Sequence, residues 1–173
     1  DEDLARVHVT TWRETYRGIM PDKVLDELSV EAGAQRWAAI ISALPQRRQL
    51  LSVAVDDKGR IVGFAGAGPT RDAGLGTAGE IYAINLVNEA KRKHVGARLM
   101  SAMADGLIEL GHDDVGLWVL ERNAGARAFY ERLGGVLSAR HERDVGGAGL
   151  IEVGYVWRDG RALLRRASAL SND

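Results

Sequence analysis

Apolar residues in the first fifty positions recur at intervals of three or four, which is the period of an α-helix. Leu4, Val7 and Thr11 follow this spacing and predict an amphipathic first helix. Gly18 and Pro21 then interrupt the pattern, as glycine and proline do at helix ends. Three helices are therefore expected, over residues 3–17, 21–28 and 30–43, the last closed by Pro45.

The period changes to two after the first fifty residues. Leu51, Val53 and Val55 alternate with smaller or polar residues, a turn follows at 56–59, and Ile61 resumes the apolar run. This alternation predicts a β-hairpin. Further strands are expected over residues 80–87, 115–120, 136–144 and 149–157, helices over 94–111 and around 126–133, and a mobile, glycine-rich loop over 68–79.

The order of these elements predicts the fold class. Helices come first, then a hairpin, then strand, helix, strand, helix and two strands. Such an order is typical of a mixed α/β sheet, with parallel pairing where a helix crosses between strands. We expect one domain over residues 1–160, followed by a polar tail over 161–173 that forms a short helix or is disordered.

Composition narrows the class of protein. The chain has 173 residues with 46% hydrophobic and 27% charged residues, which suits one globular domain. Its 23 basic and 24 acidic residues nearly cancel, so neither nucleic acid nor a membrane is expected as a partner.

The chain has no cysteine, which excludes disulfides, thiolate nucleophiles and cysteine-bound zinc. The four histidines are scattered, so no metal site is predicted. The first residues do not resemble a secretory signal, and no apolar run approaches the roughly 20 residues that span a bilayer. These features favour a cytoplasmic location.

A basic loop comes directly before the expected helix over 94–111. Lys91, Arg92 and Lys93 stand where the helix begins, and each cation there costs the helix about 0.3–1 kcal/mol. Helix amino termini attract phosphate groups, so an anion at this position would offset that cost. The alternative is a solvated basic turn. No phosphate-binding Gly-Lys-Ser/Thr loop and no dinucleotide-binding glycine motif is present.

A second cluster follows the strand over 115–120. Asn123 is a good residue to cap a helix amino terminus, and Tyr130 lies two helical turns later on nearly the same face. A tyrosine hydroxyl can act as a general acid if it reaches a leaving group. The simpler interpretation is a helix cap and a half-buried aromatic residue.

Together these clusters resemble the GNAT superfamily of N-acetyltransferases. The resemblance rests on Glu80-Ile-Tyr-Ala-Ile-Asn-Leu-Val87, the basic loop up to Gly96, and Asn123-x-x-Ala-Arg-x-Phe-Tyr130-x-x-x-Gly134. It runs through about residues 50–140 and extends more loosely to the first helices. It implies a single α/β domain whose mixed β-sheet is splayed at its centre and flanked by helices.

The resemblance also implies a site for acetyl-CoA, in the gap where strands 80–87 and 115–120 separate. The pantetheine arm would pair with Ile84, Asn85 and Leu86, and an N–H of Leu86 or Val87 would polarise the thioester carbonyl. Asn123 would contact the cofactor arm. The residues implied for the diphosphate are Lys91, Arg92, Lys93, His94, Val95, Gly96 and Ala97.

The implied reaction is direct attack of a primary amine on acetyl-CoA in a ternary complex. Tyr130 would protonate the departing thiolate. Glu80, eleven residues before Lys91, matches a catalytic glutamate of some family members and would act as the base; otherwise it is an exposed carboxylate at the start of a strand. Trp12, Tyr16 and Tyr82 are candidate walls of the acceptor site.

The acceptor is expected to be a small-molecule or peptide amine. Two alternatives stay open: a catalytically weak acyl-CoA-binding sensor or partner-binding module, and an acetyltransferase for protein N-termini or lysines. Family members are often dimers, so a homodimer is a further expectation. One departure from the family pattern is His94, which replaces a loop glycine; a left-handed backbone there costs a residue with a Cβ about 1–2 kcal/mol.

Overall fold

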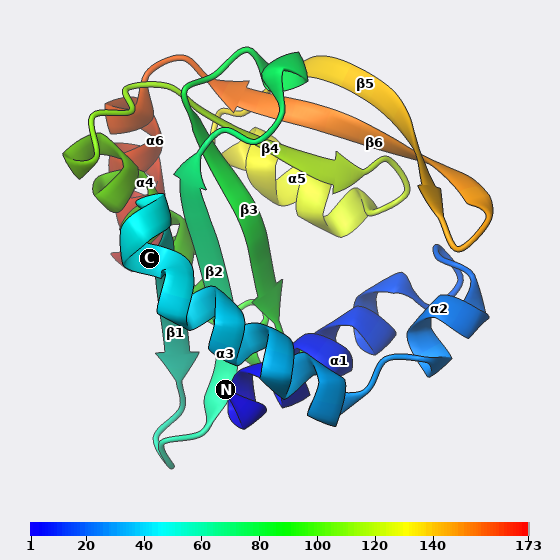
Figure 1. Cartoon of the computed structure of the whole chain (residues 1–173). Helices are drawn as coiled ribbons and strands as arrows, with labels where there is room; N and C mark the ends of the chain where they lie inside the picture. The colour runs from blue at the N-terminus through cyan, green and yellow to red at the C-terminus, as the bar shows by residue number, and fades with distance from the viewer. Residues whose placement is uncertain (173) are drawn as a thin grey trace.

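The computed structural model describes residues 1–172 (Figure 1). The helices are α1 (Glu2–Tyr16), α2 (Asp22–Asp26), α3 (Val30–Arg47), α4 (Val95–Glu109), α5 (Ala124–Arg132) and α6 (Gly160–Asn172). The strands are β1 (Leu50–Val55), β2 (Ile61–Pro69), β3 (Gly79–Leu86), β4 (Val115–Leu120), β5 (Val136–Val145) and β6 (Ala148–Trp157). Two 3-10 turns, η1 (Ala73–Leu75) and η2 (Asn88–Ala90), lie on either side of β3.

The strands form one mixed sheet in the order β1-β2-β3-β4-β6-β5. Only β3 and β4 are parallel, and they pair at just two positions, Gly79 with Val115 and Glu80 with Gly116. Beyond Glu80 the two strands separate, and Figure 1 shows them diverging from this shared end. The predicted mixed α/β fold with a centrally splayed sheet is therefore confirmed.

A bulge in β3 changes which side of the sheet its residues face. Ala67 pairs with Ile81 and Gly66 with Ala83, so Tyr82 has no partner on β2. Ile81 packs in the core beneath α4, whereas Ala83 packs with the core beneath α1 and α3. Bulges of this kind re-aim side chains. Here the bulge leaves Glu80 and Tyr82 close enough to share one arginine partner, as described below.

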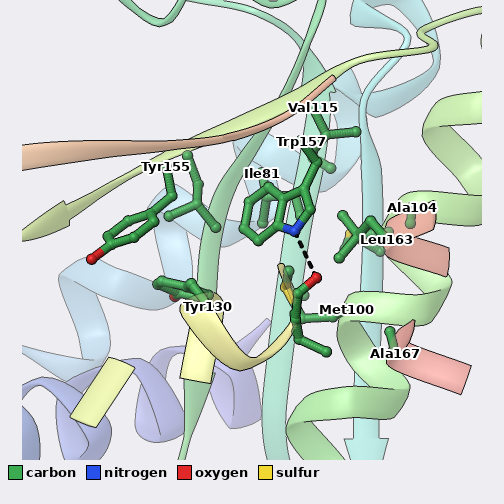
Figure 2. Close-up of a cluster of buried hydrophobic side chains, with 14 of the residues drawn as sticks. Ile81, Met100, Ala104, Val115, Tyr130, Tyr155, Trp157, Leu163 and Ala167 are labelled. Carbon is green, nitrogen blue, oxygen red and sulfur yellow. Dashed lines mark hydrogen bonds between the residues drawn. The ribbon is translucent and has the colours of Figure 1, made fainter. Parts of the chain in front are cut away.

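Two hydrophobic cores lie on opposite faces of the sheet, because neighbouring residues of a strand point to opposite sides. Phe64 of β2 packs with Trp37 of α3 in one core, and the next residue, Ala65, belongs to the other. Figure 2 shows the second core, where Met100 of α4 and Trp157 of β6 lie among buried side chains. The Trp157 indole donates a hydrogen bond to the carbonyl of Leu133, 3.0 Å away.

Helix α3 and the loop before β3 differ from the expectations. Helix α3 continues past Pro45 to Arg47 and ends where Arg48 adopts a left-handed backbone (φ 52°); proline therefore did not end it. The loop expected to be mobile is anchored, since Leu75 is buried and Asp72 accepts a hydrogen bond from the Gly74 amide.

The segment after residue 160 forms a helix, which was one of its two expected states. The helix α6 packs along α4 and buries Leu163 and Ala167 completely. Its polar residues line the outer face, which is why its composition reads as polar although one stripe is apolar. Across residues 1–172, no helix combines the length and the apolar character needed to cross a bilayer.

Candidate active site

The open edge of β3 forms one wall of the wedge between β3 and β4. The Val87 amide donates a hydrogen bond to the Val62 carbonyl on β2, 3.0 Å away. Backbone groups alternate in direction along an antiparallel strand. The N–H groups of Leu86 and Ile84 therefore point away from β2 and into the wedge, whereas the backbone of Asn85 faces β2. Of the two amides expected to polarise a carbonyl, only that of Leu86 is free to do so.

Helix α4 begins at the wide end of the wedge. Its first residues are preceded by Arg92 and His94 in left-handed conformations (φ 59° and 60°). His94 is the capping residue, but its side chain makes no capping hydrogen bond. Its ring Nδ1 instead lies 2.7 Å from the Leu170 carbonyl of α6. The first amides of α4, at Val95, Gly96 and Ala97, are thus left without a side-chain cap.

Gly96 sits where α4, β3 and α5 approach one another. A Cβ at this position would lie 3.3 Å from the Leu86 side chain and 3.4 Å from the Phe129 ring. The missing side chain therefore lets the start of α4 approach both. Close approach of a backbone is the usual reason for a glycine in a phosphate-binding loop.

The three cations of the loop are arranged differently. Lys91 donates a hydrogen bond to the Asn88 side chain, 2.7 Å away. Arg92 and Lys93 are exposed, and the carbonyl of Lys93 accepts a hydrogen bond from Arg98. The two exposed cations are therefore available to an anion at the helix terminus, while Lys91 stabilises the preceding turn.

Asn123 and Tyr130 lie on the opposite wall, on α5. The Asn123 side chain accepts a hydrogen bond from the Ala126 amide at 3.3 Å, so the predicted cap is confirmed. Tyr130 is 5% exposed. Burial raises the pKa of Tyr130, and the neighbouring Tyr16 adds to the increase. Because its pKa is raised, the Tyr130 hydroxyl is protonated at neutral pH, and within residues 1–172 no protein group hydrogen-bonds to it.

Helix α1 brings aromatic residues to the same place. Trp12 and Tyr16 pack edge to face, with ring centroids 5.3 Å apart. Burial raises the pKa of Tyr16, the negative charge of Glu152 on β6 adds to it, and the Asn123 side chain opposes it. Tyr16 packs against the cluster that contains Leu120 of β4, as does Leu150 of β6.

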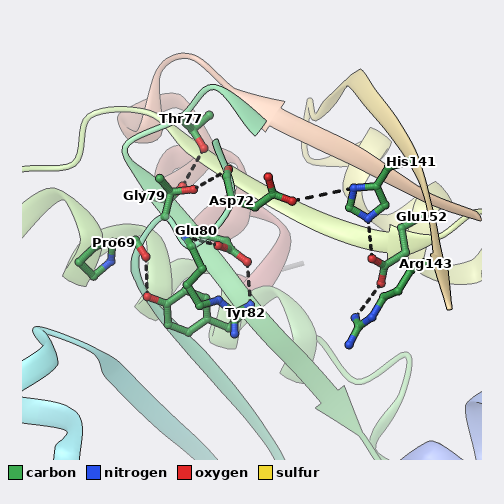
Figure 3. A network of polar contacts seen from close by, with 11 residues as sticks. Pro69, Asp72, Thr77, Gly79, Glu80, Tyr82, His141, Arg143 and Glu152 are labelled. Carbon is green, nitrogen blue, oxygen red and sulfur yellow. Dashed lines mark hydrogen bonds and ion pairs between the residues drawn. The ribbon is translucent and has the colours of Figure 1, made fainter. Parts of the chain in front are cut away.

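Glu80 lies at the narrow end of the wedge and is held by Arg71 (Figure 3). Its Oε2 accepts the Arg71 amide and its Oε1 accepts the Arg71 guanidinium, both at 2.7 Å. Its side chain is 3% exposed, so the alternative interpretation, an exposed carboxylate at the start of a strand, is wrong. The same guanidinium stacks over the ring of Tyr82 at 3.9 Å. The Tyr82 hydroxyl donates to the Pro69 carbonyl.

Comparison with known proteins identifies the fold family. Residues 9–135 match the model of the Acetyltransferase (GNAT) family. The chain belongs to the GNAT family.

A curated relative extends the match over almost the whole chain. The uncharacterized N-acetyltransferase YuaI of Bacillus subtilis (strain 168) is 34% identical over 162 residues, which cover 94% of this chain and 90% of the relative. The GNAT protein described here is therefore an acetyltransferase, as the sequence predicted.

Solved GNAT structures share the fold at low sequence identity. The PaiA N-acetyltransferase of Thermoplasma acidophilum, solved with coenzyme A, is 19% identical with a TM-score of 0.66, and the match covers 88% of this chain and 90% of that one. A phosphinothricin acetyltransferase of Sinorhizobium meliloti, solved with acetyl-CoA, is 20% identical with a TM-score of 0.66, covering 91% and 84%.

The GNAT structure also contains polar residues that sequence reasoning missed. On β5, His141 stacks on Trp118 of β4 with centroids 4.0 Å apart. Its Nε2 lies 2.9 Å from Glu152 on β6, which also pairs with Arg143 at 3.2 Å. A signal was present: a hairpin turning at Gly146-Gly147 sets His141 directly opposite Glu152. The histidine was instead counted only as one of four scattered residues.

Proposed function

We propose that this GNAT enzyme transfers an acetyl group from acetyl-CoA to a primary amine by direct attack, in a ternary complex. The observation that carries the proposal is the separation of β3 and β4 beyond Glu80, which leaves the inner edge of β3 without a strand partner. An extended arm can pair with such an edge through backbone hydrogen bonds. The absence of cysteine agrees with a route that forms no acetyl-cysteine intermediate on the enzyme.

The residues around the wedge fit acetyl-CoA. Ile84 and Leu86 would pair with the pantetheine arm through their backbone groups. The uncapped amides of α4, with the exposed Arg92 and Lys93, would hold the diphosphate. Gly96 supports this fit because its lack of a Cβ lets the start of α4 lie close to Leu86 of β3, at the edge of the wedge. When bound, acetyl-CoA supplies an activated acetyl group as a thioester.

Two groups of the chain would assist the transfer. The Leu86 N–H would stabilise negative charge on the acetyl oxygen, since its direction is into the wedge. Tyr130 would donate its proton to the departing thiolate. Tyr130 keeps its proton at neutral pH and its hydroxyl is unshared among residues 1–172, so a proton is available to the thiolate.

Glu80 is proposed as the base. Its carboxylate, buried next to Arg71, lies at the end of the wedge where the strands still pair. Trp12, Tyr16 and Tyr82 are proposed to border the acceptor, because they lie on the face of the sheet that also carries Glu80. The acceptor itself is proposed to be a small-molecule or peptide amine. The cytoplasmic location, the homodimer and a domain boundary at residue 160 stay predictions.

A thiol-release assay tests the proposed function. Purified protein with acetyl-CoA is offered benzylamine, spermidine, free lysine and peptides with a free N-terminus or an internal lysine. Amine-dependent release of coenzyme A, abolished by acetylating the amine beforehand, is expected. Tight acetyl-CoA binding without release for any amine would favour the alternative of an acyl-CoA-binding module. Release with the peptides alone would favour a protein acetyltransferase.

A further inference from the structure

A histidine in a defined polar environment lies on the same face of the sheet as Glu80. The His141 ring rests on Trp118, and its Nε2 is 2.9 Å from the Glu152 carboxylate. Its Nδ1 lies 3.9 Å from Asp72, too far for a hydrogen bond (Figure 3). The position of the ring is thus set by a stack on one side and a hydrogen bond at one nitrogen.

The hydrogen bond defines the form of the neutral ring. An ionised carboxylate only accepts hydrogen bonds, so the Nε2 that faces Glu152 must carry the proton. The other nitrogen, Nδ1, then has a free lone pair. A histidine with one nitrogen bonded to a carboxylate and the other free is the arrangement of a general base.

One loop connects His141 with the proposed base Glu80. Arg71 binds Glu80 on β3, and the next residue, Asp72, faces His141 on β5. On the other side, Glu152 is near enough to Tyr16 to raise its pKa, and Tyr16 in turn influences Tyr130. His141 therefore lies beside the loop that binds Glu80 and next to Glu152 of β6.

An acceptor that enters the site as an ammonium ion must lose two protons from its nitrogen during acetyl transfer. The nitrogen must lose one proton before it can attack and a second one after it has bonded to the acetyl carbon. This inference rests on the proposed acetyl transfer. We propose that His141 accepts the first of these protons at Nδ1, and that Glu80 accepts the second.

The steps balance as follows. The ammonium gives one proton to His141, which passes it to water. The neutral nitrogen bonds to the acetyl carbon, the carbon–sulfur bond breaks, and the thiolate takes a proton from Tyr130. The nitrogen gives its second proton to Glu80. Transfer of this proton to Tyr130 then restores both residues to their starting states. The sum is an acetylated amine, a thiol and one proton in solution.

The two proposed bases, His141 and Glu80, differ in how far their side chains are exposed to solvent. The first proton has to reach solvent, and the His141 side chain is 36% exposed whereas that of Glu80 is 3% exposed. Glu80 is also enclosed by both of its hydrogen bonds from Arg71. A histidine that touches water can exchange its proton in each cycle, which a buried, doubly bonded carboxylate does poorly.

The test is the ratio of kcat/KM between the His141→Phe variant and the wild type, measured from pH 6.5 to 10. The acceptor is whichever of benzylamine, spermidine and lysine the wild type acetylates fastest. Phenylalanine keeps the stack on Trp118. The charged groups that face the ring are Asp72 and Glu152, with Arg143 bound to Glu152.

We expect a ratio of about 0.1 or lower at pH 7, from the usual size of acid–base effects. The ratio should rise toward 1 as pH approaches the pKa of the amine, because a neutral amine needs no first base. The Glu80→Gln ratio should stay low throughout. A His141→Phe ratio that is constant over pH, or near 1 at pH 7, would overturn the inference while leaving acetyl transfer intact. Absence of thiol release by the wild type would instead contradict the proposed function itself.

Discussion

The two sides of the wedge are built by different means. The side formed by β3 and the start of α4 offers backbone amides, with Gly96 allowing close approach. The side formed by β4, β5 and β6 offers polar side chains that pair with one another, His141 with Glu152 and Glu152 with Arg143. A constant coenzyme can be held by backbone geometry, which most substitutions leave in place. A particular acceptor has to be chosen by side chains, which substitutions change readily.

The largest expected effect is on turnover, and it concerns Tyr130. Tyr130→Phe removes the proposed acid but keeps the buried ring, so turnover should fall about 100-fold or more. The KM for acetyl-CoA should change little, because the backbone groups of β3 and α4 are untouched. Steady-state thiol release measures both. Unchanged turnover would remove Tyr130 as the acid.

The second prediction concerns the pH stability of the core beneath α1 and α3. Burial lowers the pKa of His8 from 6.5 to about 4, and repulsion by Arg36 contributes. The folded state thus disfavours the charged form, and its stability is full above pH 6.5 and is lost as pH falls through 6.5 toward 4. This histidine should make the protein about 2 kcal/mol less stable at pH 5 than at pH 7.5.

Urea unfolding at the two pH values measures this loss, and His8→Gln is the comparison because glutamine does not titrate. The variant should lose less stability than the wild type between pH 7.5 and 5. Identical losses in both proteins would show that other groups govern the acid sensitivity.

Glu80→Gln should have the next largest effect. Glutamine keeps the size of the side chain and can still bond to Arg71, but it cannot take up a proton. We expect kcat/KM to fall about 10-fold or more at all pH values. Glu109→Gln, at the exposed end of α4, is the matched loss of one charge and should leave the rate unchanged. Equal effects of the two variants would argue that Glu80 acts only through net charge.

The smallest effect compares two glycines in the first turns of two helices. An added Cβ at Gly125 of α5 meets nothing within 4 Å, whereas one at Gly96 of α4 meets Leu86 and Phe129. Gly125→Ala should stabilise the protein by about 0.5–1 kcal/mol through helix propensity. Gly96→Ala should gain less and should weaken binding of coenzyme A. Thermal unfolding and titration calorimetry check both, and equal behaviour of the two variants would contradict the close approach at Gly96.

The structure of the proposed coenzyme side was largely predictable because its signals are local. The alternation of residues 80–87, the basic loop and the Asn123 cap each lie within a few consecutive residues. The bulge at Tyr82 and the commitment of the Val87 amide to β2 were not foreseeable, since both depend on the register with β2. The error at Pro45 has a similar origin, because proline inside a helix costs one hydrogen bond but does not by itself end the helix.

The contacts of the proposed acceptor side were mostly not predictable, because they join residues far apart in the sequence. Nothing near Arg71 indicates that it will bury the carboxylate of Glu80, and nothing near Trp118 indicates a stack with His141. The pairing of His141 with Glu152 is the exception, since the Gly-Gly turn fixes the hairpin register. Local patterns thus predict the elements that form β3 and the start of α4, but not the side-chain contacts across β4, β5 and β6.

The loop between β2 and β3 has a consequence for how such an enzyme diversifies. Its adjacent residues Arg71 and Asp72 reach two different strands, one toward Glu80 and the other toward His141. An insertion or deletion here would shift both contacts in a single event, while leaving the coenzyme half of the domain as it is. We therefore expect new acceptor preferences to arise during evolution through changes in the length of this loop, ahead of changes in the sheet itself.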